Sequence, residues 1–294
     1  MIFTLCSQVI HMAQNSSIEW TDHTFNPWWG CAKVSPACDH CYAELWAKRM
    51  GHAVWGREAD RRFFSDAHWR EPLAWNEEAQ SERKRRRVFC ASMADVFERR
   101  SELNAERMRL WQLIEGTPWL DWLLLTKRPQ NIGDMVPWSR KWPANVWLGT
   151  TIESQFFAEK RLPFLLKHPS AIRFLSCEPL LGSLELSTWF NKNGFYPIDW
   201  VIAGGESGPS CRPMHPDWAT KILFQCREKN IPFHFKQWGH WVPAEIVAEG
   251  TPARLIELHN ERPVKMARLP KKEAGRVLEG TTWNGLPRLA LINA

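Results

Sequence analysis

The 294-residue chain lacks the features that mark membrane, secreted and low-complexity proteins. No apolar run approaches the length of a membrane-spanning helix. The first twelve residues are mildly apolar but have no basic flank and no small-residue cleavage site, so they do not resemble a signal peptide. Met12 is a second candidate start, because the polar segment after it is typical of a natural N-terminus. With 44% hydrophobic and 24% charged residues, the composition is that of an ordinary globular protein.

Closely paired cysteines are also scarce, and tyrosine is nearly absent. Eight cysteines without regular paired spacing favour a reducing cytoplasm over a disulfide framework. The chain has 2 Tyr against 19 Trp, and we expect most of the tryptophans to pack in the core. Outside one triad, the cysteines are single, so the second close pair of a zinc ribbon is missing.

That triad, Cys31, Cys38 and Cys41, has C-x6-C-x2-C spacing and lies between a strand-like apolar run and a helix-like segment. Thiolates bind metals, and one loop lets three of them converge. A closed zinc site needs four ligands, which His40, Asp39 or a distant residue would have to complete. Three cysteines on a four-iron cluster would leave one iron open to a substrate or cofactor. The spacing favours the iron–sulfur cluster; a zinc knuckle and three incidental thiols are the alternatives.

Apolar, β-rich runs recur along the chain at the interval of one strand–helix unit. With the run before Cys31 they make about seven strands: 88–91, 119–125, 146–149, 172–175, 200–203 and 231–235. Helix-like segments lie at 42–50, 103–115, 154–167 and 217–229. Continuous apolar strands are buried on both faces, as in a parallel sheet. The sequence therefore predicts an α/β fold, a partial or near-complete TIM-like barrel of six to seven parallel strands.

Three segments divide the chain. Residues 1–16 are an N-terminal extension and a candidate for disorder. Residues 17–240 form the barrel, with a basic, Trp-rich insertion at about 51–87, and residues 241–294 form a small C-terminal appendage.

Ligands bind at the carboxyl ends of strands in such folds. Polar residues or glycines follow every predicted strand, which indicates a ligand-binding face; they include Ser92, Asp95, Thr126, Lys127, Thr150, Glu153, Cys177, Glu178, Gly204, Gly205 and Glu206.

The net charge of +6, from 38 Lys and Arg against 32 Asp and Glu, is compatible with nucleic acid. Within the insertion, the run Arg83–Arg87 is either a solvated helix face or a phosphate-binding patch. The second interpretation gives a set of candidate nucleic-acid contacts: Arg61, Arg62, Arg85, Arg86, Arg87, Lys127 and Arg128.

The triad after a first strand that opens a partial barrel resembles the radical S-adenosylmethionine (SAM) superfamily. The stretches SIEWTDHTFNPWWGC, CDHCYAE, WLLLTKRP, VWLGTTIE, RFLSCEPLLG, DWVIAGGESG and FKQWG more closely resemble an uncharacterised, phage-associated branch. Some members of that branch are thought to be akin to spore photoproduct lyase, a DNA-repair enzyme. The usual superfamily spacing is C-x3-C-x2-C, so this chain has three extra residues in the first gap.

The resemblance implies a 4Fe-4S cluster on Cys31, Cys38 and Cys41, with S-adenosyl-L-methionine on the fourth iron. Its Gly-Gly-Glu motif follows the second strand, whereas Gly204-Gly205-Glu206 follows the sixth. The contact to the SAM amino group is therefore not transferred to Glu206, and Ser92 and Asp95 are the better candidates. The remaining strand-end residues are expected cofactor contacts.

The resemblance also implies a catalytic pair and partners. Glu178 is an expected substrate contact, and Cys177 would return a hydrogen atom to a product radical, as a cysteine does in photoproduct lyases. A small buried core residue is the alternative for Cys177. An electron donor such as a flavodoxin or ferredoxin would reduce the cluster.

Three functions compete at this stage. The first is a radical SAM enzyme on DNA or RNA, for repair of the photoproduct-lyase type or base modification. The second is a radical SAM enzyme on a small molecule or peptide. The third is a zinc-stabilised nucleic-acid-binding protein without radical chemistry.

Overall fold

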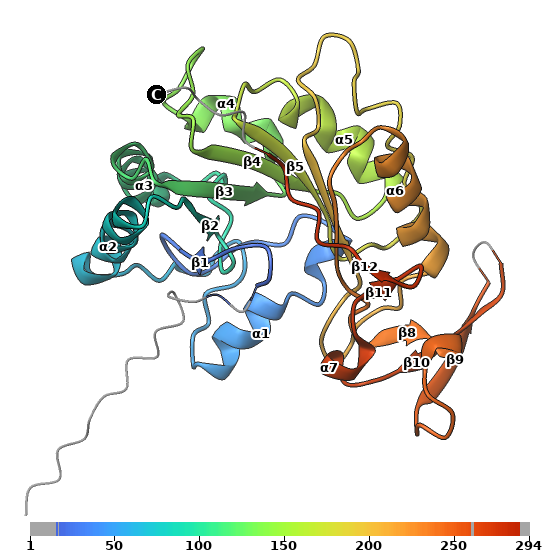
Figure 1. Ribbon diagram of the computed structural model, residues 1–294. Coiled ribbons are helices and arrows are strands. Elements are labelled where there is room, and N and C mark those ends of the chain that lie inside the picture. The colour runs from blue at the N-terminus through green and yellow to red at the C-terminus, as the bar shows by residue number, and fades with distance from the viewer. Residues whose placement is uncertain (1–15, 17, 260–261, 289–294) are drawn as a thin grey trace, which may run out of the picture.

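A computed structural model describes residue 16, residues 18–259 and residues 262–288 of the chain. Its centre is a parallel sheet of seven strands that follow one another in chain order. They are β1 (His23–Thr24), β2 (Arg86–Cys90), β3 (Leu120–Thr126), β4 (Val146–Thr151), β5 (Ile172–Cys177), β6 (Trp200–Gly204) and β7 (Phe233–Gln237). The sheet curls into a half-barrel, a partial TIM-like fold, which confirms the predicted class (Figure 1). The proposed N-terminal extension, 1–16, lies almost wholly outside the described residues.

Helices connect the strands and cover the outer face of the sheet (Figure 1). They are α1 (Tyr42–Arg49), α2 (Asp66–Ser81), α3 (Asn104–Gly116), α4 (Ile132–Met135), α5 (Gln155–Leu165) and α6 (Pro216–Glu228). The predicted helices 42–50, 103–115, 154–167 and 217–229 correspond to α1, α3, α5 and α6. Local sequence explains their ends: Pro216 occupies the first turn of α6, and Gly51 follows α1 with a left-handed φ of 78°.

The two faces of the sheet have separate hydrophobic clusters. The larger cluster joins alternate strand residues, such as Leu124, Leu148 and Val201, to helix residues such as Trp111 and Ile222. The smaller one contains strand residues and Trp20, and lies on the concave face; its members are Trp20, Phe89, Leu123, Trp147, Ile172, Phe174, Trp200 and Ile202. Side chains alternate along each strand, so a residue's cluster tells which face it occupies.

Helix α2 lies inside the segment that the sequence suggested was a polar insertion. Its buried residues, Trp69, Pro72, Trp75 and Ala79, recur at helical spacing. Trp69 and Trp75 belong to the large core cluster. Those tryptophans therefore stabilise the barrel instead of forming a surface for bases.

The C-terminal part forms a small antiparallel sheet and then returns to the barrel (Figure 1). The sheet has the order β8 (Trp241–Pro243), β10 (Val264–Arg268), β9 (Arg254–Leu258), and is followed by α7 (Lys271–Ala274), β11 (Val277–Leu278) and β12 (Thr281–Thr282). The chain then runs along β7, where the Gly285 amide donates to the Phe233 carbonyl at 2.8 Å. None of the helices described is long and apolar enough to cross a membrane.

Candidate functional site

The cysteine triad lies on the loop between β1 and α1, at the carboxyl ends of the strands. Cys41 immediately precedes α1, and Cys38 ends a short 3₁₀ turn. Two backbone hydrogen bonds fix the start of the loop: the Gly30 amide donates to Met93 at 2.9 Å, and the Cys31 carbonyl accepts from Gly56 at 3.0 Å. Gly30 has a φ of 118°, and a Cβ there would come within 2.4 Å of the Val54 carbonyl oxygen. The glycine before the first cysteine is therefore required by close backbone approach.

The three thiols are free and half-buried. Burial raises the pKa of Cys31 to about 12, although the Arg128 guanidinium opposes that shift. Burial also raises the pKa of Cys41. Both thiols are therefore protonated at neutral pH, and a metal that binds them must displace their protons.

A closed zinc site would need a fourth ligand beside the triad. Within the described residues, no three His, Cys, Asp or Glu side chains come together as ligands of one metal ion. The two residues that could complete such a site are engaged elsewhere. His40 Nδ1 lies 3.0 Å from Glu206 Oε2, and the Asp39 carboxylate lies 3.6 Å from the Arg212 guanidinium.

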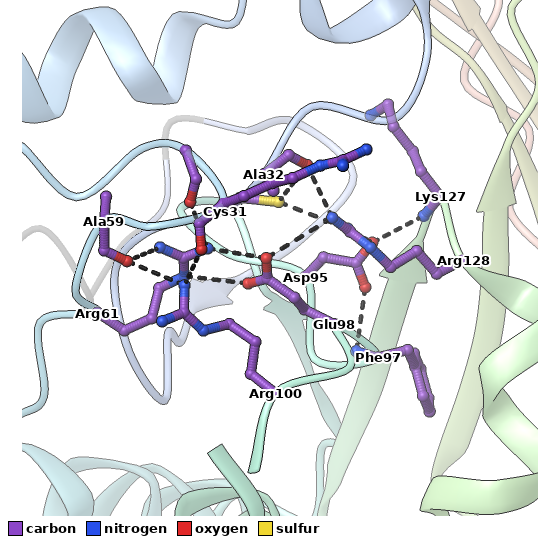
Figure 2. Close-up of polar contacts among 12 residues, drawn as sticks. Cys31, Ala32, Ala59, Arg61, Asp95, Phe97, Glu98, Arg100, Lys127 and Arg128 are labelled. Atoms are coloured by element: carbon purple, nitrogen blue, oxygen red, sulfur yellow. Dashed lines mark hydrogen bonds and ion pairs between the residues drawn. The ribbon is translucent and has the colours of Figure 1, made fainter. Parts of the chain in front are cut away.

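Arg128 connects the end of β3 to the first cysteine (Figure 2). Its guanidinium lies 3.5 Å from Cys31 Sγ and donates to the Ala32 carbonyl at 2.7 Å. Asp95 holds it from the other side at 2.8 Å, and also accepts from the Thr126 hydroxyl at 2.7 Å and the Lys127 amide at 3.1 Å. Burial opposes ionisation of Asp95, but Arg128 and these hydrogen bonds hold its pKa below the ordinary value. Asp95, Thr126 and Arg128 thus position the cysteine loop.

Arg61 belongs to a second buried pair beside this network (Figure 2). Its guanidinium makes a two-point contact with Glu98, at 3.0 and 2.8 Å, and donates to the carbonyls of Val54 and Gly56. The residue is 5% exposed. Arg61 therefore has a structural role in place of the phosphate contact expected from the sequence.

Glu206, after β6, is brought to the cysteine loop. It is buried and accepts from the Arg212 backbone amide at 2.8 Å and from its side chain, while His40 contacts it from the loop. Burial opposes its ionisation, but Arg212 and His40 hold its pKa below the ordinary value. Arg212 also donates to the Pro36 carbonyl at 2.8 Å. Glu206 thus connects the end of β6 to the loop that carries the triad.

The glycines before Glu206 allow close approach of neighbouring chain. A Cβ on Gly205 would lie 2.0 Å from the Trp238 carbonyl oxygen, and one on Gly204 would lie 2.9 Å from Glu178 Oε1. The Glu178 carboxylate fits against Gly204 and pairs with Lys236 Nζ at 3.1 Å. Gly204 and Gly205 therefore shape the site through the space they leave.

Strand register corrects two sequence-based expectations. Thr150 pairs with Leu175, and Cys177 pairs with Ala203; both partners belong to the helix-facing cluster. Cys177 is fully buried there and its pKa is raised by burial and by Cys226 of α6. The expected hydrogen-atom donor thus faces away from the barrel interior, because alternation along β5 puts it on the outer face.

The neighbouring residues face the interior instead. Thr151 pairs with Ser176, and Ser176 pairs with Ile202 of the concave cluster. The Thr150 hydroxyl is bound to the Thr126 carbonyl at 2.8 Å, whereas the Thr151 hydroxyl is buried and has no hydrogen-bond partner among the described residues. Thr151, Ser176 and Lys236 were not among the site residues expected from the sequence. Because side chains alternate along β4 and Trp147 lies on the concave face, Thr151 must lie on that face too.

Glu153 follows β4 and is 1% exposed. One carboxylate oxygen binds Arg161 at 2.6 Å, and the other, Oε1, has no hydrogen-bond partner in the described structure. Ser92, after β2, exchanges hydrogen bonds with Asn26, and its carbonyl accepts from the Tyr42 hydroxyl at 3.1 Å. These two strand ends therefore lie at the same edge as the triad, as predicted from parallel topology.

The basic run lies at the other end of the sheet, because Arg86 begins β2 whereas the triad follows the end of β1. Arg85 pairs with Asp121 at 2.6 Å, Arg86 with Glu82, and Arg87 with Asp22 at 3.2 Å. Arg62 stacks its guanidinium 4.7 Å from the Trp29 ring centre. Arg85, Arg86 and Arg87 are therefore partnered and remote from the candidate site.

Comparisons with known proteins give one family and a set of solved structures. No curated protein matches the chain. A spore photoproduct lyase variant with bound AdoMet and dinucleoside spore photoproduct has a TM-score of 0.43 and 9% identity, covering 89% of this chain and 72% of that one. A second variant of that enzyme gives 0.44 and 11%, with the same coverage. At such low TM-scores and identities, neither the substrate nor the reaction of that enzyme can be assigned to this chain. The model described as "Protein of unknown function (DUF5131)" matches residues 15–287, and the chain therefore belongs to that family.

Proposed function

We propose that this protein is a radical SAM enzyme that acts on nucleic acid. The observation that carries the proposal is the cysteine loop: three half-buried thiols, spaced C-x6-C-x2-C, at the carboxyl edge of a partial barrel. A four-iron cluster held by three cysteines leaves one iron open, whereas a closed zinc site needs a fourth protein ligand. The donor set therefore fits a cluster better than a closed zinc site.

Cys31, Cys38 and Cys41 would hold three irons of a 4Fe-4S cluster and leave the fourth for SAM. When bound and reduced by one electron from a flavodoxin or ferredoxin, the cluster and SAM would supply a 5′-deoxyadenosyl radical for hydrogen abstraction, with methionine as the other product of SAM cleavage. The chain's own part begins with the loop. Arg128 places a fixed positive charge next to Cys31 Sγ, which stabilises the thiolate that the ligand role requires.

The unpartnered oxygens at the end of β4 are the candidate contacts for SAM. A buried polar atom without a partner costs free energy, so the Thr151 hydroxyl and Glu153 Oε1 favour a ligand that supplies the missing hydrogen bonds. SAM offers suitable donors in its amino, ribose and adenine groups. Glu153 Oε1 also supplies a carboxylate oxygen that suits the positive sulfonium. Cys177 has no part in the chemistry we propose, because it packs against the helices.

The cytoplasm is the compartment we expect, because it keeps the thiols reduced until a cluster assembles.

Nucleic acid is the substrate class we favour over a small molecule or peptide. The support is a cavity next to the triad that is lined by six cationic side chains and one acidic one among the described residues.

Metal content tests the proposal. Wild-type protein, purified and reconstituted without oxygen, is expected to hold about four irons and four sulfides per chain. Cys38→Ala should lose them, whereas Cys226→Ala, a control in the helix layer, should keep them. The reconstituted wild type should then release 5′-deoxyadenosine when SAM and a reductant are added. About one zinc per chain and no iron would overturn the radical mechanism.

A further inference from the structure

A cavity of about 460 Å³ lies beside the cysteine loop. It adjoins the end of β4, because Arg161 of its lining donates to the Thr151 carbonyl at 2.8 Å and to Glu153 at 2.6 Å. Its walls come from the loop itself, the segment after α1, the end of β3 and the first turns of α5. Six cationic side chains line it: Lys33, Arg57, Lys127, Arg128, Lys160 and Arg161. Asp39 is the one acidic side chain among the described lining residues. The cavity therefore has a strong positive bias.

Three of these cations are compensated and three are not. Arg128 pairs with Asp95, Arg161 with Glu153, and Lys33 with Glu44. In the described part of the chain, no carboxylate lies within ion-pair distance of the other three, Arg57, Lys127 and Lys160. Arg57 and Lys160 are exposed and Lys127 is half-buried. Uncompensated cations from three separate segments thus converge on one cavity, which favours an anion there.

The cavity suits phosphate esters better than SAM. SAM carries a positive sulfonium, which the surplus of cations would repel. The volume is within the range of a small-molecule pocket and holds one or two nucleotides but no duplex. Phe157 adds an aromatic wall next to Lys160, and cations combined with an aromatic ring are typical of single-strand binding sites.

We infer that this cavity binds the sugar–phosphate backbone of a single nucleic-acid strand beside the cysteine loop. The inference rests on the proposed function only for the chemistry that follows binding. It places the strand at the carboxyl end of the barrel, and not on the basic run Arg83–Arg87 at the amino end. There Arg85, Arg86 and Arg87 have acidic partners, and the two cations without an ion pair among the described residues, Arg83 and Lys84, come from one segment.

Anisotropy of a fluorescein-labelled, mixed-sequence 12-nucleotide single-stranded DNA tests this on the full chain. The two variants are Lys160→Glu and Arg57→Glu, at exposed positions where folding does not depend on the side chain. Arg83→Glu is the matched control, an exposed arginine at the opposite end. Each cavity variant should weaken binding on the order of tenfold at 50 mM salt and reduce the slope of log K against log salt by about 0.7. The control should do neither.

Two results would overturn the inference. One is equal loss of affinity in Arg83→Glu and in the cavity variants, which would mean that the probe senses only net charge. The other is displacement of the probe by inorganic phosphate at the concentration at which unlabelled 12-mer displaces it, which would assign the cavity to free anions. Preferential displacement by the 12-mer supports a strand.

Iron content of the same wild-type preparation separates this inference from the proposed function. A protein that holds the cluster but binds DNA independently of Lys160 and Arg57 refutes the strand site and leaves the radical mechanism standing. A protein that binds DNA through these residues but holds no iron supports the strand site and refutes the radical mechanism.

Discussion

Asp95 and Arg128 form a buried ion pair whose members depend on each other. Asp95→Asn keeps the shape but leaves the guanidinium buried without a full counter-charge. Since breaking a buried pair is far more costly than breaking a surface pair, the free energy of unfolding should fall by about 3 kcal/mol. Asp134→Asn is the control, because its pair with Arg99 is mostly exposed and should contribute less than about 1 kcal/mol. Denaturant unfolding measures both, and equal losses would contradict the buried-pair interpretation.

His234 makes stability depend on pH. Burial, together with the nearby charges of Lys236 and Arg87, lowers its pKa to about 4. Between that value and the ordinary pKa, the unfolded chain binds more protons than the folded one, so stability falls as the pH drops from about 6.5 to 4. Over this pH range, protonation of His234 should lower the free energy of unfolding by about 3 kcal/mol. In His234→Phe, which keeps a ring beside Trp200, the free energy of unfolding should decline less steeply over this range. The same steepness in both proteins would rule out His234 as the cause.

Single residues also show where sequence reasoning succeeds and where it fails. The triad was selected by its C-x6-C-x2-C spacing, and Glu206 and Asp95 because they follow strands. Parallel topology alone brings the ends of those strands together. Thr150 and Cys177 were misplaced by one position. Buried parallel strands are apolar on both faces, so the sequence contains no amphipathic pattern to tell inner from outer residues.

At the scale of elements, the loops after β6 and β7 touch at Gly205. Gly205→Ala would set a Cβ 2.0 Å from the Trp238 carbonyl oxygen, so the backbone must move and take Glu206 with it. We expect a loss of about 1–3 kcal/mol in unfolding free energy. The variant should also retain less iron after reconstitution, because Glu206 and Arg212 hold the cysteine loop.

Gly182→Ala is the control for this substitution. Its added Cβ would meet nothing nearer than Ser154 Cβ at 3.7 Å, an ordinary contact. The melting temperature and the iron content after reconstitution are to be measured for Gly205→Ala and for Gly182→Ala. If Gly205→Ala melts and binds iron like the control, the loops do not constrain the site.

Helix α2 was the element that the sequence analysis did not recognise. The polar, Arg-rich composition of the segment around it and the basic run next to it pointed to an insertion, yet Trp69 and Trp75 are core residues. The run Arg83–Arg87 links α2 to β2, and its arginines pair with acids from three segments: Asp22, Glu82 and Asp121. Two of those acids lie far away in sequence, so their pairing required the three-dimensional fold.

The whole molecule separates its charges between the two ends of the barrel. Among the residues that the structure describes, Arg85, Arg86 and Arg87 at the amino end are neutralised by ion pairs and Arg83 and Lys84 are not, whereas at the carboxyl end uncompensated cations from three segments converge on one cavity beside the triad. Net charge alone could not reveal this division, because +6 is the sum of both ends. The convergence of unpartnered cations on one cavity, on which the proposed strand site rests, is visible only in the folded chain.

The return of the C-terminal segment to β7 closes one edge of the sheet, and Gly285 is the residue that permits it. A Cβ there would lie 2.6 Å from the backbone nitrogen and oxygen of Phe233, which cannot move aside. Gly285→Ala should thus break the bond to Phe233 and the 2.7 Å bond from the Trp200 indole, at a cost of about 1–3 kcal/mol. It should also expose the edge of β7 and promote aggregation.

Gly116→Ala provides the comparison, since a Cβ at the end of α3 would meet nothing within 4 Å. We expect this control to melt at or slightly above the wild-type temperature, because alanine favours helix more than glycine does. Light scattering during a thermal ramp should report aggregation in Gly285→Ala at a lower temperature than in Gly116→Ala. Coincident curves would mean that the segment around Gly285 does not stabilise the edge, and that the barrel holds β7 without it.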